Sequence, residues 1–170
     1  MTHPVVLVVM GVTGSGKTTV GLILAGRLGW PFQEGDSLHP QSNIEKMTAG
    51  QPLTDGDRAP WLERIAGWVD ERLDAGESGV ITCSALKRSY RDIINRRGSG
   101  VMFVFLRASK SGVAARLVAR HEHFMAPTLI DSQFADLEEP APDEPAVIVD
   151  SSAPPGVVAD DVIEALGVRD

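Results

Sequence analysis

Cysteine is almost missing from this chain of 170 residues: Cys83 stands alone, so no disulfide bond can form within the chain. Cytosolic proteins keep their thiols reduced, and we therefore expect a cytoplasmic protein. No apolar run approaches the roughly 20 residues that a membrane-spanning helix needs. No basic segment precedes the first apolar run either, so we expect neither a membrane partner nor a secretion signal.

Basic residues are outnumbered, with 16 Lys and Arg against 23 Asp and Glu and a net charge of −7. An acidic chain is a poor match for a nucleic acid, whose binding depends on phosphate contacts. The charges are uneven along the sequence, because residues 80–120 contain nine basic residues and one acid, Asp92. This basic middle indicates a local site for small anions, or else solvated helix faces.

The length and the hydrophobic fraction of 43% predict one globular domain over residues 1–170. Strand-like apolar runs alternate with segments of helical periodicity, which is typical of an α/β fold with a parallel, doubly wound sheet. Strands are expected at residues 5–10, 31–35, 80–83, 101–106 and 146–149. Helices are expected at residues 18–28, 37–50, 60–73, 87–97, 109–120, 127–137 and 157–166.

Residues 11–18, GVTGSGKT, match the P-loop pattern G-x-x-x-x-G-K-[ST] at every fixed position. An apolar strand precedes the motif and a helical pattern follows it, which is the required context. The loop amides and the helix N-terminus would hold the phosphates, Lys17 would reach the β and γ phosphates, and Thr18 would bind Mg²⁺. The alternative is a Gly-rich turn that only starts a helix. The candidate nucleotide-binding residues here are Gly11, Thr13, Gly14, Ser15, Gly16, Lys17, Thr18 and Thr19.

Two classes of P-loop protein fit the sequence poorly. Guanine-specific switches need an Asn-Lys-x-Asp motif, and neither Asn43 nor Asn95 belongs to one. Motor and transporter ATPases usually have a strand that ends in Asp beside the P-loop strand, whereas the third predicted strand here ends in Cys83 and Ser84. A compact phosphoryl-transfer enzyme is the class that fits, since positioning and charge neutralisation do most of its catalysis.

Two carboxylates lie at the C-terminal end of the second predicted strand, outside which ligands of open α/β sheets bind. Asp36 would accept or orient the proton of a phosphoryl acceptor, unless it only caps the next helix. Glu34 would hold Mg²⁺ through water, unless it is a solvated turn acid.

Five separated segments stand out in the sequence: MGVTGSGK (10–17), GDSLHP (35–40), NIEKM (43–47), PLTDGDR (52–58) with PWL (60–62), and CSALK (83–87) with YRD (90–92). Together they resemble the bacterial gluconokinases of the thermoresistant type, which are related to shikimate and nucleoside monophosphate kinases. The resemblance implies a P-loop kinase fold, with a five-stranded parallel sheet, helices on both faces and a short lid near residues 120–127. It also implies ATP-dependent phosphorylation of D-gluconate at its 6-hydroxyl, with Mg²⁺, in a homodimer.

The resemblance assigns roles to further residues. It locates Arg58 at the acceptor site, where its planar fork suits a carboxylate, and Arg120 on the lid, where it would neutralise charge on the transferred group. Arg116 would stack on adenine beside a turn formed by residues 150–152 and Pro154. The other candidates for the acceptor site are His39, Lys87, Tyr90, Arg91 and His123, with Gln133 as a weaker one. Surface ion pairs are the alternative role for the basic residues among them.

Two other functions stay open at this point. The first is a different kinase of the same fold, acting on shikimate or on another sugar acid. The second is a nucleotide-dependent binding module that has no acceptor.

Overall fold

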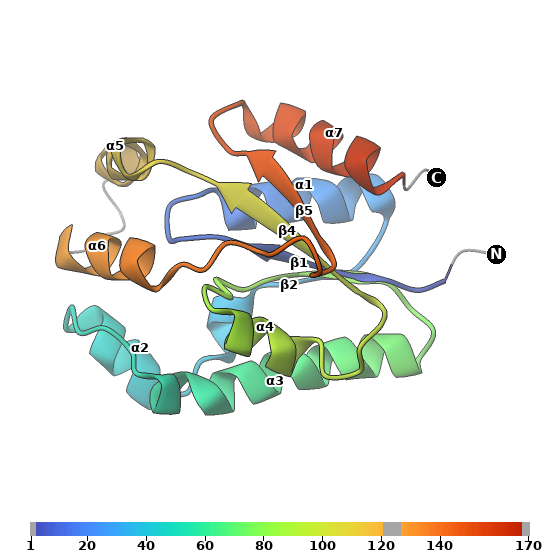
Figure 1. The fold of residues 1–170 in the computed structure, drawn as a ribbon, viewed down its shortest axis with the longest axis horizontal. Coiled ribbons are helices and arrows are strands. Elements are labelled where there is room, and N and C mark those ends of the chain that lie inside the picture. The colour runs from blue at the N-terminus through green and yellow to red at the C-terminus, as the bar shows by residue number, and fades with distance from the viewer. Residues whose placement is uncertain (1–2, 121–126, 168–170) are drawn as a thin grey trace.

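The computed structural model describes residues 3–120 and 127–167, and its centre is a parallel sheet of five strands (Figure 1). The strand order is β2-β3-β1-β4-β5. This confirms the predicted α/β fold with a five-stranded parallel sheet. The strands are β1 (Val6–Met10), β2 (Phe32–Gln33), β3 (Gly79–Thr82), β4 (Val101–Arg107) and β5 (Ala146–Asp150).

The central strand β1 is apolar along its whole length because both of its faces are covered. All five of its side chains are inaccessible to solvent, as expected for a parallel strand with helices on either side. In the register of the sheet, Val8 lies opposite Ile81 of β3 and Phe103 of β4. The loop that follows β1 therefore leaves the sheet at its centre.

Two layers of helices cover the sheet (Figure 1). Helices α1 and α7 pack on one face around Leu24 and Val162, and α3 and α4 pack on the other around Trp61 and Ile94. The helices are α1 (Lys17–Leu28), α2 (Gln41–Thr48), α3 (Asp55–Asp74), α4 (Arg88–Ile94), α5 (Lys110–Arg120), α6 (Pro127–Asp136) and α7 (Pro155–Leu166).

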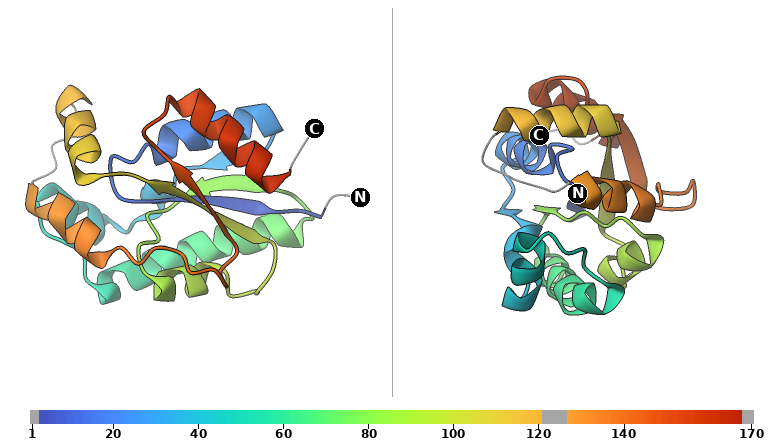
Figure 2. Two further views of the ribbon diagram at one scale, coloured as in Figure 1. Left: turned by 45° about the horizontal axis from the view of Figure 1, so that its top comes forward. Right: turned by 90° about the vertical axis from the view of Figure 1, so that its left-hand side faces the viewer.

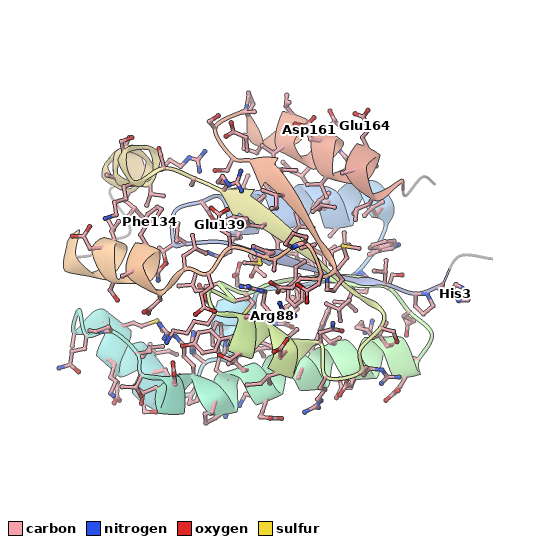
Figure 3. All side chains as sticks on the ribbon, in the orientation of Figure 1. His3, Arg88, Phe134, Glu139, Asp161 and Glu164 are labelled. Carbon is pink, nitrogen blue, oxygen red and sulfur yellow. The ribbon has the colours of Figure 1, made fainter. Side chains whose placement is uncertain are left out.

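Three helices, α2, α5 and α6, gather at the carboxyl ends of the strands, on the left of Figure 1 and facing the viewer in the right-hand panel of Figure 2. Phe134 extends from α6 on the side of α5 (Figure 3) and packs against Val113 and Leu117. This end of the sheet is where α/β proteins bind their ligands. Within residues 3–120 and 127–167, no helix combines the length and the apolar character needed to cross a bilayer.

Three predicted helices have different bounds in the structure. The helix expected at residues 87–97 runs only from Arg88 to Ile94. The helix expected at residues 37–50 is split into a 3₁₀ turn, η1 (Gly35–Leu38), and α2. His39 and Pro40 between them are extended, because a proline disfavours helical geometry in the residue before it. The helix expected from Pro60 begins instead at Asp55, where Thr54 caps it. Asp55 and Asp57, predicted as loop residues, therefore belong to the first turn of α3.

Candidate active site

The predicted P-loop forms a tight turn between β1 and α1. Gly16 caps α1 with a φ of 97°, a left-handed conformation that L side chains adopt at a cost. At Gly11 a Cβ atom would lie 2.9 Å from the carbonyl oxygen of Leu106, so the backbone passes too close to β4 for a side chain. The first amides of α1 have no acceptor within the helix and are available to an anion.

Two side chains of the P-loop are placed as a phosphate site requires. Lys17 lies over the loop, where its Nζ donates to the carbonyl oxygens of Gly11 and Val12 at 2.9 and 3.0 Å. The hydroxyl of Ser15 is buried and has no hydrogen-bond partner among the described residues. An unpaired buried hydroxyl is costly, and a bound phosphate oxygen is the kind of group that would satisfy it.

The proposed metal ligands meet beside the P-loop. Thr18 Oγ1 donates to Glu34 Oε2 at 2.6 Å, and Thr82 Oγ1 donates to the other carboxylate oxygen. Thr82 in turn accepts the N–H of Gly35 at 3.0 Å. A Cβ at Gly35 would overlap the carbonyl oxygen of Thr82 at 1.7 Å, so only glycine allows this approach. The oxygen donors of Thr18 and Glu34 fit Mg²⁺, which prefers hard oxygen ligands and keeps most of its waters.

A pocket of about 170 Å³, lined by both polar and apolar side chains, opens next to these groups; we call it the acceptor pocket. It joins the P-loop to the segment after β2, to α3 and to α6. Its lining residues are Thr13, Lys17, Asp36, His39, Met47, Gln51, Pro52, Leu53, Arg58, Trp61, Ser84, Ser132 and Gln133. The sequence predicted Asp36, His39, Arg58 and Gln133 for this region, and the structure brings them together with Lys17.

Asp36 lies in η1 on the wall of the acceptor pocket. The residue that precedes η1 is Glu34, which makes no side-chain capping bond. The Asp36 carboxylate accepts no hydrogen bond from any residue in 3–120 or 127–167, since only its main-chain oxygen is bonded, by His39 N–H. The capping alternative therefore receives no support, and the carboxylate is available to a ligand.

His39 is held in one orientation on the pocket wall. Its ring stacks on Trp61 at a centroid distance of 4.0 Å, and only 7% of the residue is exposed. The Asn43 side-chain amide lies 3.1 Å from His39 Nδ1 and also donates to the Asp57 carbonyl. An amide nitrogen can only donate, so Nδ1 accepts and the ring proton sits on Nε2. Burial lowers the pKa of His39, while Asp36 opposes that shift and Arg58 adds to it.

Arg58 is anchored at the base of the pocket. Its Nη1 donates to the Tyr90 hydroxyl at 2.9 Å and lies 3.8 Å from the carboxylate of Asp136 on α6. Tyr90 donates to Asp55, which also accepts from Lys87 at 3.2 Å. The hydrogen bonds from Tyr90 and Lys87 lower the pKa of Asp55. Arg58 thus presents a guanidinium that is buried, oriented and only weakly paired with a carboxylate.

Lys87 and Tyr90 contact Arg58 or its partners and do not line the acceptor pocket directly. Arg91 lies elsewhere. Its guanidinium forms two hydrogen bonds with Glu144, at 2.6 and 3.1 Å, and a third with the Ala85 carbonyl, and its side chain is only 1% exposed. Lys87, which was expected within the same helix as Arg91, precedes α4 as its N-cap.

A second cavity, of about 510 Å³, lies on the other side of the P-loop between the ends of β4 and β5 and α5. Arg116 joins the two sites, since it donates to the Gly14 carbonyl of the P-loop at 3.1 Å and to the Ser151 carbonyl. The predicted adenine-binding groups, Arg116 and residues 150–152, are therefore side by side in this cavity. Ile148, which is 44% exposed, gives it an apolar wall.

Two predicted residues cannot be located at the site. Arg120 is the last residue of α5, and its side chain lies outside what the structure describes. His123, with most of the expected lid, falls in residues 121–126, which are outside the described residues.

Several residues of the site were not predicted, among them Asn43, Trp61, Thr82 and Ser84. Trp61 is buried in the core, but its indole N–H also donates to the Gly35 carbonyl at 2.8 Å and its ring stacks on His39. Asn43 belongs to the NIEKM segment and Ser84 to CSALK. A polar residue inside a segment that resembles a kinase motif was the available signal for both.

Comparisons with known proteins agree with this geometry. The family model for shikimate kinase matches residues 13–166. A gluconokinase of Gluconobacter oxydans is 50% identical over 167 residues, which cover 98% of this chain and 94% of the relative. The chain belongs to the gluconokinase family. The match to the shikimate kinase model agrees with the relationship between these kinases that the motifs implied.

Two solved structures resemble this gluconokinase family member over nearly their whole length. The crystal structure of a gluconokinase from Sinorhizobium meliloti has a TM-score of 0.88 and 45% identity, covering 98% of this chain and 94% of that one. A sugar kinase from a Janibacter species, solved without ligand, has a TM-score of 0.90 and 42% identity, with coverages of 97% and 95%. The resemblance stated from the five sequence segments is therefore confirmed.

Proposed function

We propose that the chain transfers the γ-phosphoryl group of ATP to the 6-hydroxyl of D-gluconate, giving 6-phosphogluconate and ADP. The observation that carries the proposal is that the P-loop and the acceptor pocket adjoin each other. Thr13 and Lys17 of the P-loop also line the acceptor pocket, which holds Asp36 and Arg58. A phosphate on the P-loop would therefore face an alcohol bound beside Asp36. The 50% identity to a gluconokinase supports gluconate as the acceptor.

The nucleotide would extend from the second cavity to the acceptor pocket. Adenine would lie in the cavity between Arg116 and Ile148, and the phosphates on the amides at the start of α1. Lys17 would release the loop carbonyls and move to the phosphate oxygens. Thr18 and Glu34 would hold Mg²⁺, which supplies neutralisation of phosphate charge when it is bound.

Gluconate carries one carboxylate and several hydroxyls, and the pocket offers partners for both. Arg58 is the cation for the carboxylate, since its fork is buried and already oriented by Tyr90. His39 offers its Nε2 proton to a hydroxyl. At the other end of the substrate, the 6-hydroxyl oxygen attacks the γ-phosphorus, the bond to the β,γ-bridging oxygen breaks, and Asp36 accepts or orients the hydroxyl proton.

Three further features belong to the proposal. They are Mg²⁺ as the metal of the nucleotide, a homodimer as the assembly, and the cytoplasm as the location. The resemblance to gluconokinases supports the first two, and the single buried Cys83 supports the third. A kinase of the same fold that acts on shikimate or another sugar acid is the alternative.

A coupled assay decides between these functions. The protein is given Mg-ATP with gluconate, shikimate, glucose or a nucleoside monophosphate, and ADP formation is followed. We expect turnover with gluconate alone. Turnover with another acceptor and none with gluconate would refute the proposed substrate. Slow ATP hydrolysis that no acceptor accelerates would indicate a binding module.

Two variants test the assigned roles. Asp36→Asn should lower kcat by roughly 10²- to 10⁴-fold, the range typical of general acid–base groups. Arg58→Lys should raise the gluconate KM, because an ammonium cannot form the two parallel bonds of a guanidinium, and should leave the ATP KM within about twofold. An unchanged gluconate KM in Arg58→Lys would exclude Arg58 as the carboxylate anchor.

A further inference from the structure

One polar contact joins α6 to the P-loop. The main-chain N–H of Thr13 donates to Gln133 Oε1 at 2.6 Å, although the two residues are 120 positions apart in the sequence. Apolar packing fixes the helix in this place, since Phe134 and Ile130 lie against a cluster that includes Val12, the residue before Thr13. The apolar packing of α6 therefore fixes the position of Gln133 relative to the P-loop.

This contact determines which way the Gln133 amide faces. A main-chain N–H can only donate, so the atom opposite Thr13 must be the side-chain oxygen. The NH₂ group on the same carbon consequently points away from Thr13. It donates to no residue within 3–120 or 127–167. Because Gln133 lines the acceptor pocket together with Thr13, Lys17 and Asp36, two free donors lie at the junction of the two substrate sites.

We propose that Gln133 is a substrate-binding and positioning residue with a different task at each end of its amide. Oε1 fixes the P-loop through Thr13, and Nε2 donates a hydrogen bond to a hydroxyl oxygen of the bound acceptor. One side chain then binds both the acceptor and the P-loop and fixes the distance between them, as in-line phosphoryl transfer requires. The inference rests on the proposed function, because it takes a polyol acid as the ligand of Nε2.

The charges around the pocket favour a neutral donor at this point. Arg58 and Lys17 already supply positive charge for the carboxylate and the phosphates, whereas the middle of the substrate carries only hydroxyls. An amide matches a hydroxyl oxygen without adding charge. Asp136, one turn further along α6, lies 3.8 Å from Arg58, so the same helix contacts both Thr13 and Arg58, two residues that line the pocket.

Two substitutions separate the two tasks. In Gln133→Glu, a carboxylate oxygen can still accept the Thr13 N–H, but no donor is left for the acceptor. In Gln133→Met, a side chain of similar length has neither group. Asp131→Asn is the matched control, because Asp131 lies on the same helix, its side chain is 70% exposed and its partner is Lys110.

The measurements are the gluconate KM, the ADP dissociation constant and the thermal unfolding midpoint. Gln133→Glu should raise the gluconate KM about tenfold or more, the size of one lost hydrogen bond to a substrate hydroxyl. Its ADP affinity should stay within about threefold and its midpoint close to that of the wild type. Gln133→Met should raise the gluconate KM similarly and also lower the midpoint, because Thr13 N–H loses its acceptor.

Three outcomes would overturn the inference. An unchanged gluconate KM in Gln133→Glu would show that Nε2 does not touch the acceptor. An equal loss of ADP and gluconate affinity in that variant would show a charge effect at the P-loop. A midpoint unchanged in Gln133→Met would show that the Thr13 contact does not hold the loop. Wild-type turnover on gluconate is measured first, so a failure of the proposed function appears before any variant is compared.

Discussion

His39 is a neutral imidazole held between a tryptophan ring and an asparagine amide. Asn43 donates to Nδ1, and burial lowers the pKa of the ring. Protonation would place a second proton opposite the Asn43 amide and a positive charge near Arg58. The unfolded chain, with an ordinary histidine pKa near 6.5, gains that proton at a higher pH than the native protein does.

This difference predicts a pH dependence of stability. Below about pH 6.5 the unfolded state binds more protons at His39 than the native state, so the free energy of unfolding falls as the pH falls. When the pH falls from 7.5 to 5.5, His39 should lower the free energy of unfolding by at most about 1.4 kcal/mol. This limit is the value for one pH unit, because pH 5.5 lies one unit below the ordinary histidine pKa. Urea unfolding of the wild type and of His39→Gln at both pH values measures this change. The free energy of unfolding should fall less in the variant than in the wild type.

His3 provides the control, because it is exposed near the N-terminal end of the described chain (Figure 3). His3→Gln should keep the pH dependence of the wild type. If His39→Gln and the wild type lost equal stability between the two pH values, the imidazole would not be held neutral in the native protein.

At the residue scale, the sequence predicted those site residues whose role follows from a motif. Lys17 lies over the P-loop and Thr18 bonds to Glu34 beside it. Asp36 and Arg58 line one pocket. Arg91 was misplaced because spacing along a helix does not reveal a buried partner. That partner, Glu144, lies 53 positions away, and nothing in the local sequence indicates the pair.

At the scale of elements, α4 is tied to the site by this ion pair. Arg91 donates to the carbonyl of Ala85, a non-glycine residue with a φ of 46°. The preceding residue, Ser84, lines the acceptor pocket and accepts the N–H of Gly11. Burial alone would raise the pKa of Glu144, but the bonds from Arg91 and Ala141 outweigh it and the pKa is lowered. The pair is therefore charged and holds a strained turn.

Arg91→Met should destabilise the protein by about 3–5 kcal/mol, because it leaves the Glu144 carboxylate buried without its partner. Arg88→Met is the control on the same helix. Arg88 pairs with Asp143, and these side chains are 44% and 65% exposed. An exposed pair contributes about 0–1 kcal/mol. Chemical denaturation measures the free energy of unfolding of both variants. Equal losses in the two variants would mean that the buried Arg91 pair stabilises the protein no more than the exposed Arg88 pair.

The start of α3 is a second feature of this scale. Thr54 accepts the N–H of Asp57 and the Asp57 carboxylate accepts the N–H of Thr54, a capping box closed by side chains of Thr and Asp. Lys46 of α2 also bonds to Asp57, and these bonds lower the pKa of Asp57 to about 2. Residues 51–57 are rich in turn residues, which predicts a loop, and the helical repeat of apolar residues predicts a helix only from Pro60. The reciprocal cap was the signal that should have moved the boundary.

Thr54→Ala should cost about 1 kcal/mol of stability, within a range of about 0.5–2 kcal/mol for lost N-caps. Thr48→Ala is the control, since Thr48 is exposed at the end of α2 and its hydroxyl donates to the carbonyl of Ile44. Its effect should stay within about 0.5 kcal/mol. Urea unfolding of the two alanine variants compares them. A cost in Thr54→Ala no larger than in Thr48→Ala would contradict the assigned cap.

At the scale of the whole molecule, the strand order explains why one chain can hold two substrates in line. The P-loop leaves the central strand β1. The acceptor pocket lies on the side of β2 and β3, and the second cavity lies at the ends of β4 and β5. The alternation of strands and helices predicted the parallel sheet. The order of the strands decides which loops become neighbours, and this order cannot be predicted from the periodicity of the sequence.

A nucleotide bound across this arrangement should stabilise the entire fold, because it would connect β1, α1 and the ends of β4 and β5. At a concentration 100 times its dissociation constant, a ligand of the native state adds about 2.7 kcal/mol. For a chain of this size that corresponds to a rise of roughly 5–10 °C in the thermal midpoint. We expect Mg-ADP to produce such a rise and ADP with a chelator to produce a smaller one at the same ADP concentration.

Glu34→Gln should abolish the difference between these two conditions, because the neutral amide cannot neutralise a divalent cation. The amide oxygen can still accept one of the two threonine hydroxyls, and the NH₂ group can donate to the oxygen of the other, so the midpoint without ligand should change little. Glu164→Gln on the exposed face of α7 should behave as the wild type. If Glu34→Gln kept the full magnesium-dependent rise, the cation would be held without this carboxylate, and the position assigned to Mg²⁺ between Thr18 and Glu34 would be wrong.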